Sequence, residues 1–96
     1  MDTRMVNMLR AVAEELGVSE DELLQRGLRS VLERQLREVN AEILEIHGRY
    51  EVADVADMES RYRQGTLDEA DSWRDLQRLD HLEYRRDRLL GLLESL

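Results

Sequence analysis

The residue types that most often do chemistry are sparse in this chain, and their spacing does not suit catalysis or metal binding. The two histidines, His47 and His81, have Leu44 and Arg78 three residues before them rather than a glutamate. A carboxylate-bridged metal pair in a helical bundle needs Glu-x-x-His twice, so we expect no such centre. The absence of cysteine excludes disulfides, thiolate metal sites and a cysteine nucleophile.

The five serines also lack the setting of a nucleophile. None of them sits in a strand-turn-helix elbow, and the chain has no glycine-rich phosphate loop. Two of them, Ser19 and Ser72, stand just before predicted helices, where serine commonly caps the first turn. We therefore predict a protein that is not an enzyme and has no cofactor or metal.

Acidic residues on the last predicted helix are a candidate site for protein binding. Asp80, Glu83 and Asp87 recur at helical spacing and fall on one face. Arginines stand among them, so a solvated, ion-paired face is one interpretation. A patch that recognises basic residues of a partner protein is the other.

Aromatic residues extend this candidate patch. Trp73, the only tryptophan, is followed by Arg74, and Tyr84 lies further along the same helix. Trp73 either packs against Tyr50 or Tyr62 at the end of the fold or anchors an interface, because Trp and Arg contribute much of the energy of protein interfaces. The partner-binding hypothesis thus includes Trp73, Arg74 and Tyr84.

The charge of the chain also bears on its partners. The net charge is −8, and all 14 basic residues are arginine. This balance argues against unaided, non-specific nucleic-acid binding, since phosphate neutralisation supplies most of that affinity. No apolar run is long enough to span a membrane and no leader pattern is present, so we expect a cytoplasmic protein that binds a basic protein.

The elements that must position these residues are helices, and residues 1–96 are predicted to form a single all-α domain. Lack of proline and richness in Leu, Glu, Arg and Ala favour this class. We predict four helices, at about 3–16, 20–47, 54–64 and 72–94. The longest begins at the capping box Ser19 to Glu22. Its apolar seam comprises Leu32, Leu36, Val39, Ile43, Ile46 and Tyr50.

A second seam runs along the last helix through Leu79, Leu82, Leu89, Leu93 and Leu96. The two seams predict a long antiparallel helical hairpin whose outer surface is left for a second subunit or another protein, so we expect a dimer. Gly27 lies inside the longest helix, where glycine is usually accepted only for close packing. We expect the first helix to cross there.

The stretch from 9 to 36 resembles the two-helix part of ribbon-helix-helix antitoxins and repressors. The matching residues are Leu9, Ala13, Leu16, Gly17-Val18-Ser19, Glu22-Leu23, Leu28-Arg29 and Leu32. In that family a strand paired across the dimer reads DNA, and the turn after the first helix meets the DNA backbone. The resemblance implies an autorepressor that uses Ser19, Arg26 and Arg29, although the residues before Leu9 do not alternate as a strand would.

Residues 50–96 resemble small helical prokaryotic proteins, of an archaeal type, from the antitoxin side of toxin-antitoxin pairs. The matching residues are Tyr50-x-Val52, Met58-Glu59, Tyr62, Gly65 and Ser72-Trp73-x-Asp75-Leu76. The main hypothesis is therefore a non-catalytic, antitoxin-like binding module that neutralises a basic partner protein. A DNA-binding autorepressor and a structural homodimer are the alternatives.

Overall fold

The computed structural model describes all residues from Met1 to Leu96 and consists of helices without strands. The helices are α1 (Thr3–Leu16), α2 (Glu20–Tyr50), α3 (Val55–Gln64) and α4 (Glu69–Glu94). The all-helical class predicted from the sequence is confirmed. None of the helices combines enough length with enough apolar residues to span a membrane.

Side-chain caps set the start of each helix. The carboxylate of Asp2 accepts a hydrogen bond from the backbone N–H of Met5 at the start of α1, and Asp54 caps α3 in the same way. The Ser19 hydroxyl accepts from the N–H of Glu22, which is one half of the predicted capping box, whereas the Glu22 carboxylate pairs with Arg26 instead of returning to Ser19. The starts of α1 and α2 therefore agree with the sequence.

Helix α2 continues to Tyr50, beyond the predicted end near His47. Gly48 lies inside the helix, and the chain leaves it at Glu51, which adopts a left-handed conformation with φ 55°. Arg61 donates a 2.7 Å hydrogen bond to the carbonyl of Glu51 and so holds this turn. The helix therefore ends at the left-handed Glu51 and not at Gly48.

Helix α4 begins at Glu69, three residues before the predicted start, so the proposed cap at Ser72 is wrong. The cap is Asp68, whose carboxylate accepts from the N–H of Ala70 at 2.9 Å. Ser72 is buried one turn inside the helix, where its hydroxyl donates to the carbonyl of Asp68 and also bonds to the Tyr62 hydroxyl, each at 2.7 Å. Both bonds satisfy a polar group that has left solvent.

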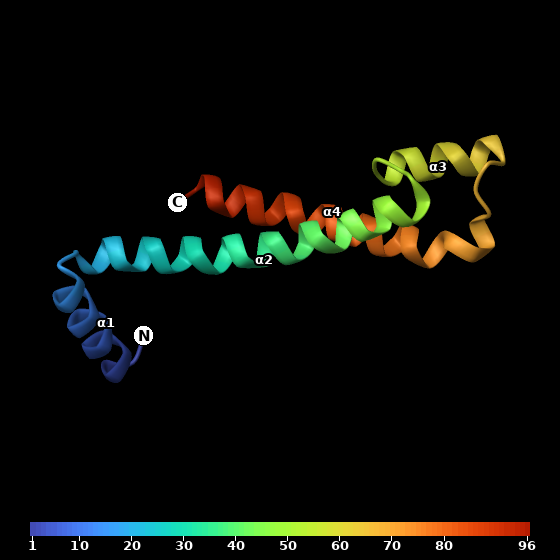
Figure 1. The fold of residues 1–96 in the computed structure, drawn as a ribbon. Helices are drawn as coiled ribbons and strands as arrows, with labels where there is room; N and C mark the ends of the chain where they lie inside the picture. Colours follow the sequence, from blue (N-terminus) through green and yellow to red (C-terminus); the bar gives the residue numbers. More distant parts are fainter.

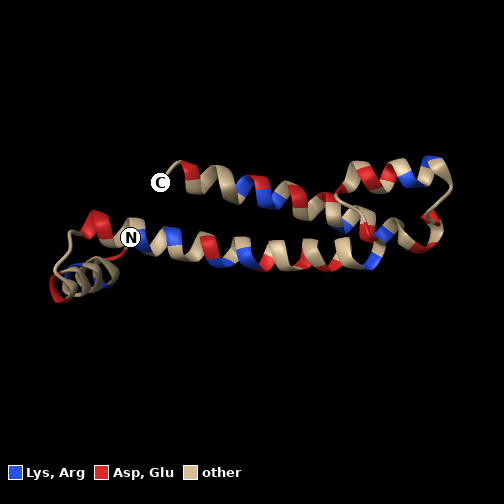
Figure 2. Ribbon diagram, turned by 45° about the horizontal axis from the view of Figure 1, so that its top comes forward, with Lys and Arg blue, Asp and Glu red and all other residues tan.

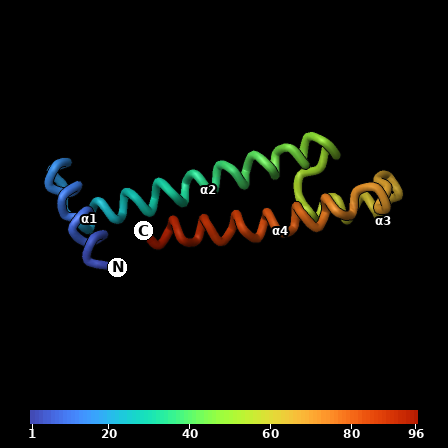
Figure 3. The backbone as a smooth tube through the Cα atoms, turned by 90° about the horizontal axis from the view of Figure 1, so that it is seen from below, coloured from blue at the N-terminus to red at the C-terminus, as the bar shows by residue number.

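Helices α2 and α4 lie side by side and run in opposite directions, as Figures 1 and 3 both show. Their leucine and isoleucine seams meet in the core, and α3 folds back onto α4 and adds Met58, which is completely buried. The core cluster contains Val39, Ile43, Ile46, Val52, Met58, Leu79, Leu82 and Leu89. The predicted antiparallel hairpin is therefore present.

The molecule is a rod rather than a sphere. Its principal extents are 61 × 21 × 19 Å and its radius of gyration is 19.8 Å. A compact chain of this length would have a radius of gyration of about 12–13 Å. We call the end that holds α3 the closed end, and the end where α4 stops beside the start of α2 the open end.

Helix α1 lies across the open end and contacts α2 alone (Figures 1 and 3). Ala13 is its one buried residue, and an ion pair joins Arg10 to Glu20 at 3.7 Å. The expectation that α1 crosses α2 at Gly27 is wrong, because no atom lies within 4 Å of the position that a Cβ at Gly27 would occupy.

Candidate protein-binding surface

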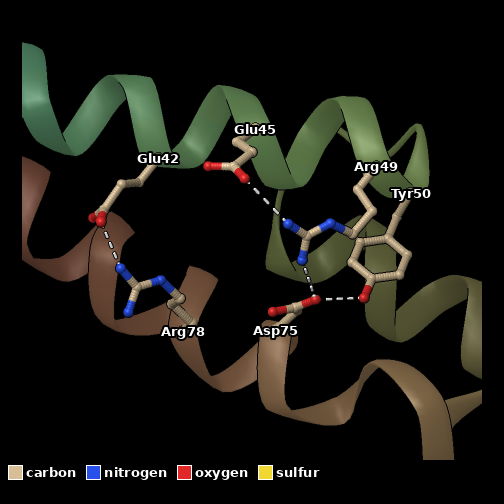
Figure 4. Close-up of polar contacts among 6 residues, drawn as sticks. All are labelled: Glu42, Glu45, Arg49, Tyr50, Asp75 and Arg78. Atoms are coloured by element: carbon tan, nitrogen blue, oxygen red, sulfur yellow. Dashed lines mark hydrogen bonds and ion pairs between the residues drawn. The ribbon is translucent and has the colours of Figure 1, made fainter.

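Polar contacts at the closed end fix the register of α4 against α2 and thereby decide which α4 residues face outward (Figure 4). The Tyr50 hydroxyl and the Arg49 guanidinium both donate to the Asp75 carboxylate, the latter at 2.8 Å. One turn further along α4, Arg78 pairs with Glu42 at 2.5 Å. These bonds between the two helices fix the position of α4 along α2 more closely than the apolar seam does by itself.

The hydrogen bonds in this cluster shift the pKa values of Asp75 and Tyr50. The hydrogen bond from Tyr50, together with the hydrogen bond and the positive charge of Arg49, holds the pKa of Asp75 below its usual value of 3.8. The same bond to Asp75, with partial burial, raises the pKa of Tyr50 above its usual value of 10.0. The cluster therefore favours an ionised Asp75 and a protonated Tyr50 at neutral pH.

The outer face of α4 carries four of the residues that the sequence indicated for partner binding. We define this outer face as Trp73, Asp80, Tyr84 and Asp87. Successive members are seven, four and three residues apart, which are close to whole turns of an α-helix. They form one line on the side opposite the buried Leu79 and Leu82.

All four side chains of the outer face are exposed. Trp73 is 45% exposed and Tyr84 is 64% exposed. The core packing of Tyr50 and Tyr62 does not include Trp73, which favours the interface interpretation of this tryptophan over the end-packing one. Aromatic and carboxylate groups thus alternate along a surface that no other part of the chain covers.

A shallow hollow of 390 Å³ adjoins this face beside Tyr84. Its lining residues are Tyr84, Asp87, Arg88, Gly91, Leu92 and Ser95. Asp87 also pairs with Arg86 at 3.1 Å, on the rim of the exposed line.

Two other predicted residues do not join this line. The carboxylate of Glu83 faces α3, where it accepts a 3.2 Å hydrogen bond from the backbone N–H of Val55. Glu83 therefore helps to position α3. Arg74 is exposed, but it lies about a quarter turn away from Trp73 around the helix.

The residues predicted for the nucleic-acid alternative lie at the start of α2, and two of them make contacts within that helix. The Ser19 hydroxyl caps α2, and Arg26 pairs with Glu22 at 2.7 Å within the same helix. Arg29 is exposed. Residues 1–96 contain no strand.

The largest hollow, of 590 Å³, crosses the middle of the hairpin, and six of its nine lining residues are polar or charged. Glu42 and Arg78 pair with each other there, and Arg85 donates to Gln35 at 3.1 Å. His81 opens onto the same hollow, whereas His47 lies elsewhere on α2. No group of three or more His, Asp or Glu residues is arranged to hold a metal ion.

An apolar hollow of 380 Å³ at the open end is a feature that sequence reasoning missed. Its lining residues are Leu28, Val31, Leu32, Leu92, Ser95 and Leu96. The signal was present, because Leu24, Leu28 and Val31 follow helical spacing beside the main seam. The predicted seam, which starts at Leu32, does not include Leu24, Leu28 and Val31.

A family model described as the Uncharacterized protein MJ0235 family matches residues 1–96. The match extends over the whole hairpin and α1 together. No curated protein and no solved structure matches the chain significantly. The chain belongs to the MJ0235 family.

Proposed function

We propose that this chain is a non-catalytic protein-binding module that binds a basic partner protein through the outer face of α4. The observation that carries the proposal is the exposed line of Trp73, Asp80, Tyr84 and Asp87. An exposed tryptophan and tyrosine are costly to leave uncovered, and both residue types are common anchors of protein interfaces.

The chemistry of the outer face suits arginine and lysine. A guanidinium or ammonium group stacks on the face of Trp73 or Tyr84 and pairs with the neighbouring carboxylate of Asp80 or Asp87. The alternation of the two group types along one line allows several basic side chains of one partner helix or strand to bind together. The net charge of −8 adds long-range attraction to such a partner.

The biological role that we propose is antitoxin-like: the module covers and neutralises a basic protein. The absence of catalytic spacing in the sequence and the resemblance of residues 50–96 to antitoxin-side proteins support this role. A DNA-binding autorepressor has less support, because Ser19 and Arg26 are engaged within the chain. We also propose that the module acts as a homodimer.

Affinity capture with matched variants tests the proposal. The wild-type chain is immobilised and exposed to a lysate of its native cells, beside an outer-face variant that combines Trp73→Ala, Asp80→Asn, Tyr84→Ala and Asp87→Asn. We expect the wild type to retain one or a few basic proteins that the variant does not retain. Added salt should weaken the capture, because part of it is electrostatic.

The control for charge alone is Glu14→Gln with Glu15→Gln. Both glutamates are exposed on α1, away from the outer face, and the pair removes the same number of negative charges. The control should capture the same proteins as the wild type. Equal capture by the outer-face variant, or capture of no basic protein by the wild type, would refute the proposal.

A further inference from the structure

We propose that two copies of this chain join at their open ends, with the apolar hollow of each copy covering that of the other. The proposal concerns a different surface from the outer face of α4. It rests on the homodimer proposed above and specifies which surfaces of the two copies meet and how the copies are arranged. The two copies form an isologous pair, in which the same patch on each chain meets its symmetry mate.

The first half of α2 has an apolar pattern but no fully buried residue, and only Leu32 and Leu36 pack, partly buried, against the core cluster. From Glu20 to Glu38 no residue is buried, and the first buried residue of the helix is Val39. This half is about 28 Å long. A helix of that length with leucines on one side is marginal in water unless another surface packs against it.

Exposed apolar side chains are concentrated at the same end. Twelve large apolar residues are exposed in the chain, and only Leu44, Trp73 and Tyr84 lie away from the open end. The others are Met1, Met5, Met8, Leu16, Leu24, Leu28, Val31, Leu90 and Leu92. Val31 is 61% exposed and Leu28 is 53% exposed, although both line the hollow.

The chain has more accessible surface area than a compact monomer of the same mass, and the excess is large enough for one partner's share of a stable interface. The chain exposes 7156 Å². A compact monomer of 11.3 kDa would expose about 5,700 Å². The excess of about 1,400 Å² exceeds the about 800 Å² that each partner contributes to a standard stable interface.

The distribution of charge along the rod favours a second copy of this chain as the occupant of the apolar hollow. It also favours the open end as the place where the two copies meet. Residues 51–71 at the closed end contain seven acids and two arginines, so most of the net charge of −8 lies there (Figure 2). The six residues that line the apolar hollow carry no ionisable side chain. Pairing at the open ends therefore keeps the two acidic closed ends apart and brings apolar side chains together.

Sedimentation equilibrium with two matched variants tests the interface. Val31→Glu places a charge in the hollow, and Leu44→Glu places the same charge on the outer side of α2, where Leu44 is 70% exposed. Glutamate favours helix at least as well as the residues it replaces, so both variants should keep the helical circular dichroism of the wild type. We expect the wild type and Leu44→Glu to sediment at twice 11.3 kDa at about 100 µM chain.

Val31→Glu should weaken self-association about tenfold or more, because the dimer would bury its carboxylate without a partner. A monomeric wild type, or a Val31→Glu dimer as stable as the wild-type dimer, overturns the proposal. A monomeric wild type would also remove the proposed homodimer, but neither result bears on capture of a basic protein by the outer face, so the failure of this proposal and the failure of the proposed partner binding are distinguishable.

Distances between spin labels test the arrangement. The natural chain has no cysteine, so Ser95→Cys at the hollow and Ser60→Cys on α3 each give one labelled position per copy. Dimers joined at the open ends should show a short distance between the two labels at position 95 and a much longer one at position 60. A shorter distance at position 60 than at position 95 would contradict contact between the open ends.

Discussion

Replacing Tyr50 with phenylalanine tests how far the polar cluster at the closed end stabilises the hairpin. The change keeps the ring that packs against the core and removes the hydroxyl that donates to Asp75. A hydrogen bond to a charged group contributes about 1.5–3 kcal/mol. Because the Asp75 side chain is 25% exposed, water replaces part of the bond, and we expect a loss of about 1–2 kcal/mol.

The pH dependence of this loss follows from the two pKa shifts. The lowered pKa of Asp75 stabilises the folded state above about pH 3.8, and this contribution disappears as the pH falls through the folded value. The raised pKa of Tyr50 stabilises the folded state below about pH 10.0, and its contribution disappears as the pH rises through the folded value. The stability difference between wild type and Tyr50→Phe should therefore be largest between these limits and shrink on both sides.

Urea unfolding followed by circular dichroism measures the difference, and thermal melting gives an independent value. For a domain of this size each kcal/mol corresponds to about 4–8 °C in Tm. Tyr84→Phe is the matched control, because Tyr84 is 64% exposed and its hydroxyl makes no hydrogen bond within the chain. Equal stability of Tyr50→Phe and Tyr84→Phe at pH 7, or a difference that is constant from pH 3 to pH 7, would refute the reasoning.

Other substitutions test the core and the backbone. Ser72→Ala should cost about 1–2 kcal/mol, since it leaves the Tyr62 hydroxyl without its partner, and the double variant with Tyr62→Phe should recover part of the loss in urea unfolding. Leu79→Ala, at a fully buried position, should cost about 2–5 kcal/mol in the same assay. Gly48→Ala should raise the free energy of unfolding by about 0.5–1 kcal/mol, because Gly48 is helical and its Cβ position is open. Gly65→Ala should lower it by about 1–2 kcal/mol, because φ is +72° at the end of α3, and thermal melting of the two glycine variants should shift in opposite directions.

The helices and the hairpin were predictable because they depend on local signals. Apolar spacing along α2 and α4 determines which sides meet, and the caps at Ser19 and Asp54 need only the next turn of chain. The buried side chains of Val39, Ile43 and Leu82 all belong to the predicted seams.

The errors in the predicted boundaries have tertiary causes. Ser72 has the spacing of a cap, but α3 supplies Tyr62 as a partner and the serine becomes a buried residue inside α4. Gly48 is a typical helix-ending residue, yet α2 continues to Tyr50, and Arg61 holds the turn at Glu51. In both cases the contact joins residues ten positions apart, which lies beyond the spacing patterns within one helix.

The candidate surfaces were predictable only in part. Helical spacing placed Asp80 and Asp87 on one face, and the structure adds that Trp73 shares this line and is exposed. The same spacing also included Glu83, which instead faces α3. The apolar surface at the open end could not be predicted from the spacing. It depends on where α4 stops beside α2, which is near Gln25, and that point is set by the length of the closed-end turn.

Amide hydrogen exchange at several protein concentrations tests most directly whether the closed end folds by itself while the open end depends on a second copy. In dilute solution, amides in residues 39–50 of α2 should exchange far more slowly than those in residues 20–38, because buried side chains begin at Val39. Raising the concentration should slow exchange in residues 20–38 and leave residues 39–50 unchanged. Uniform protection along α2 at every concentration would contradict the account.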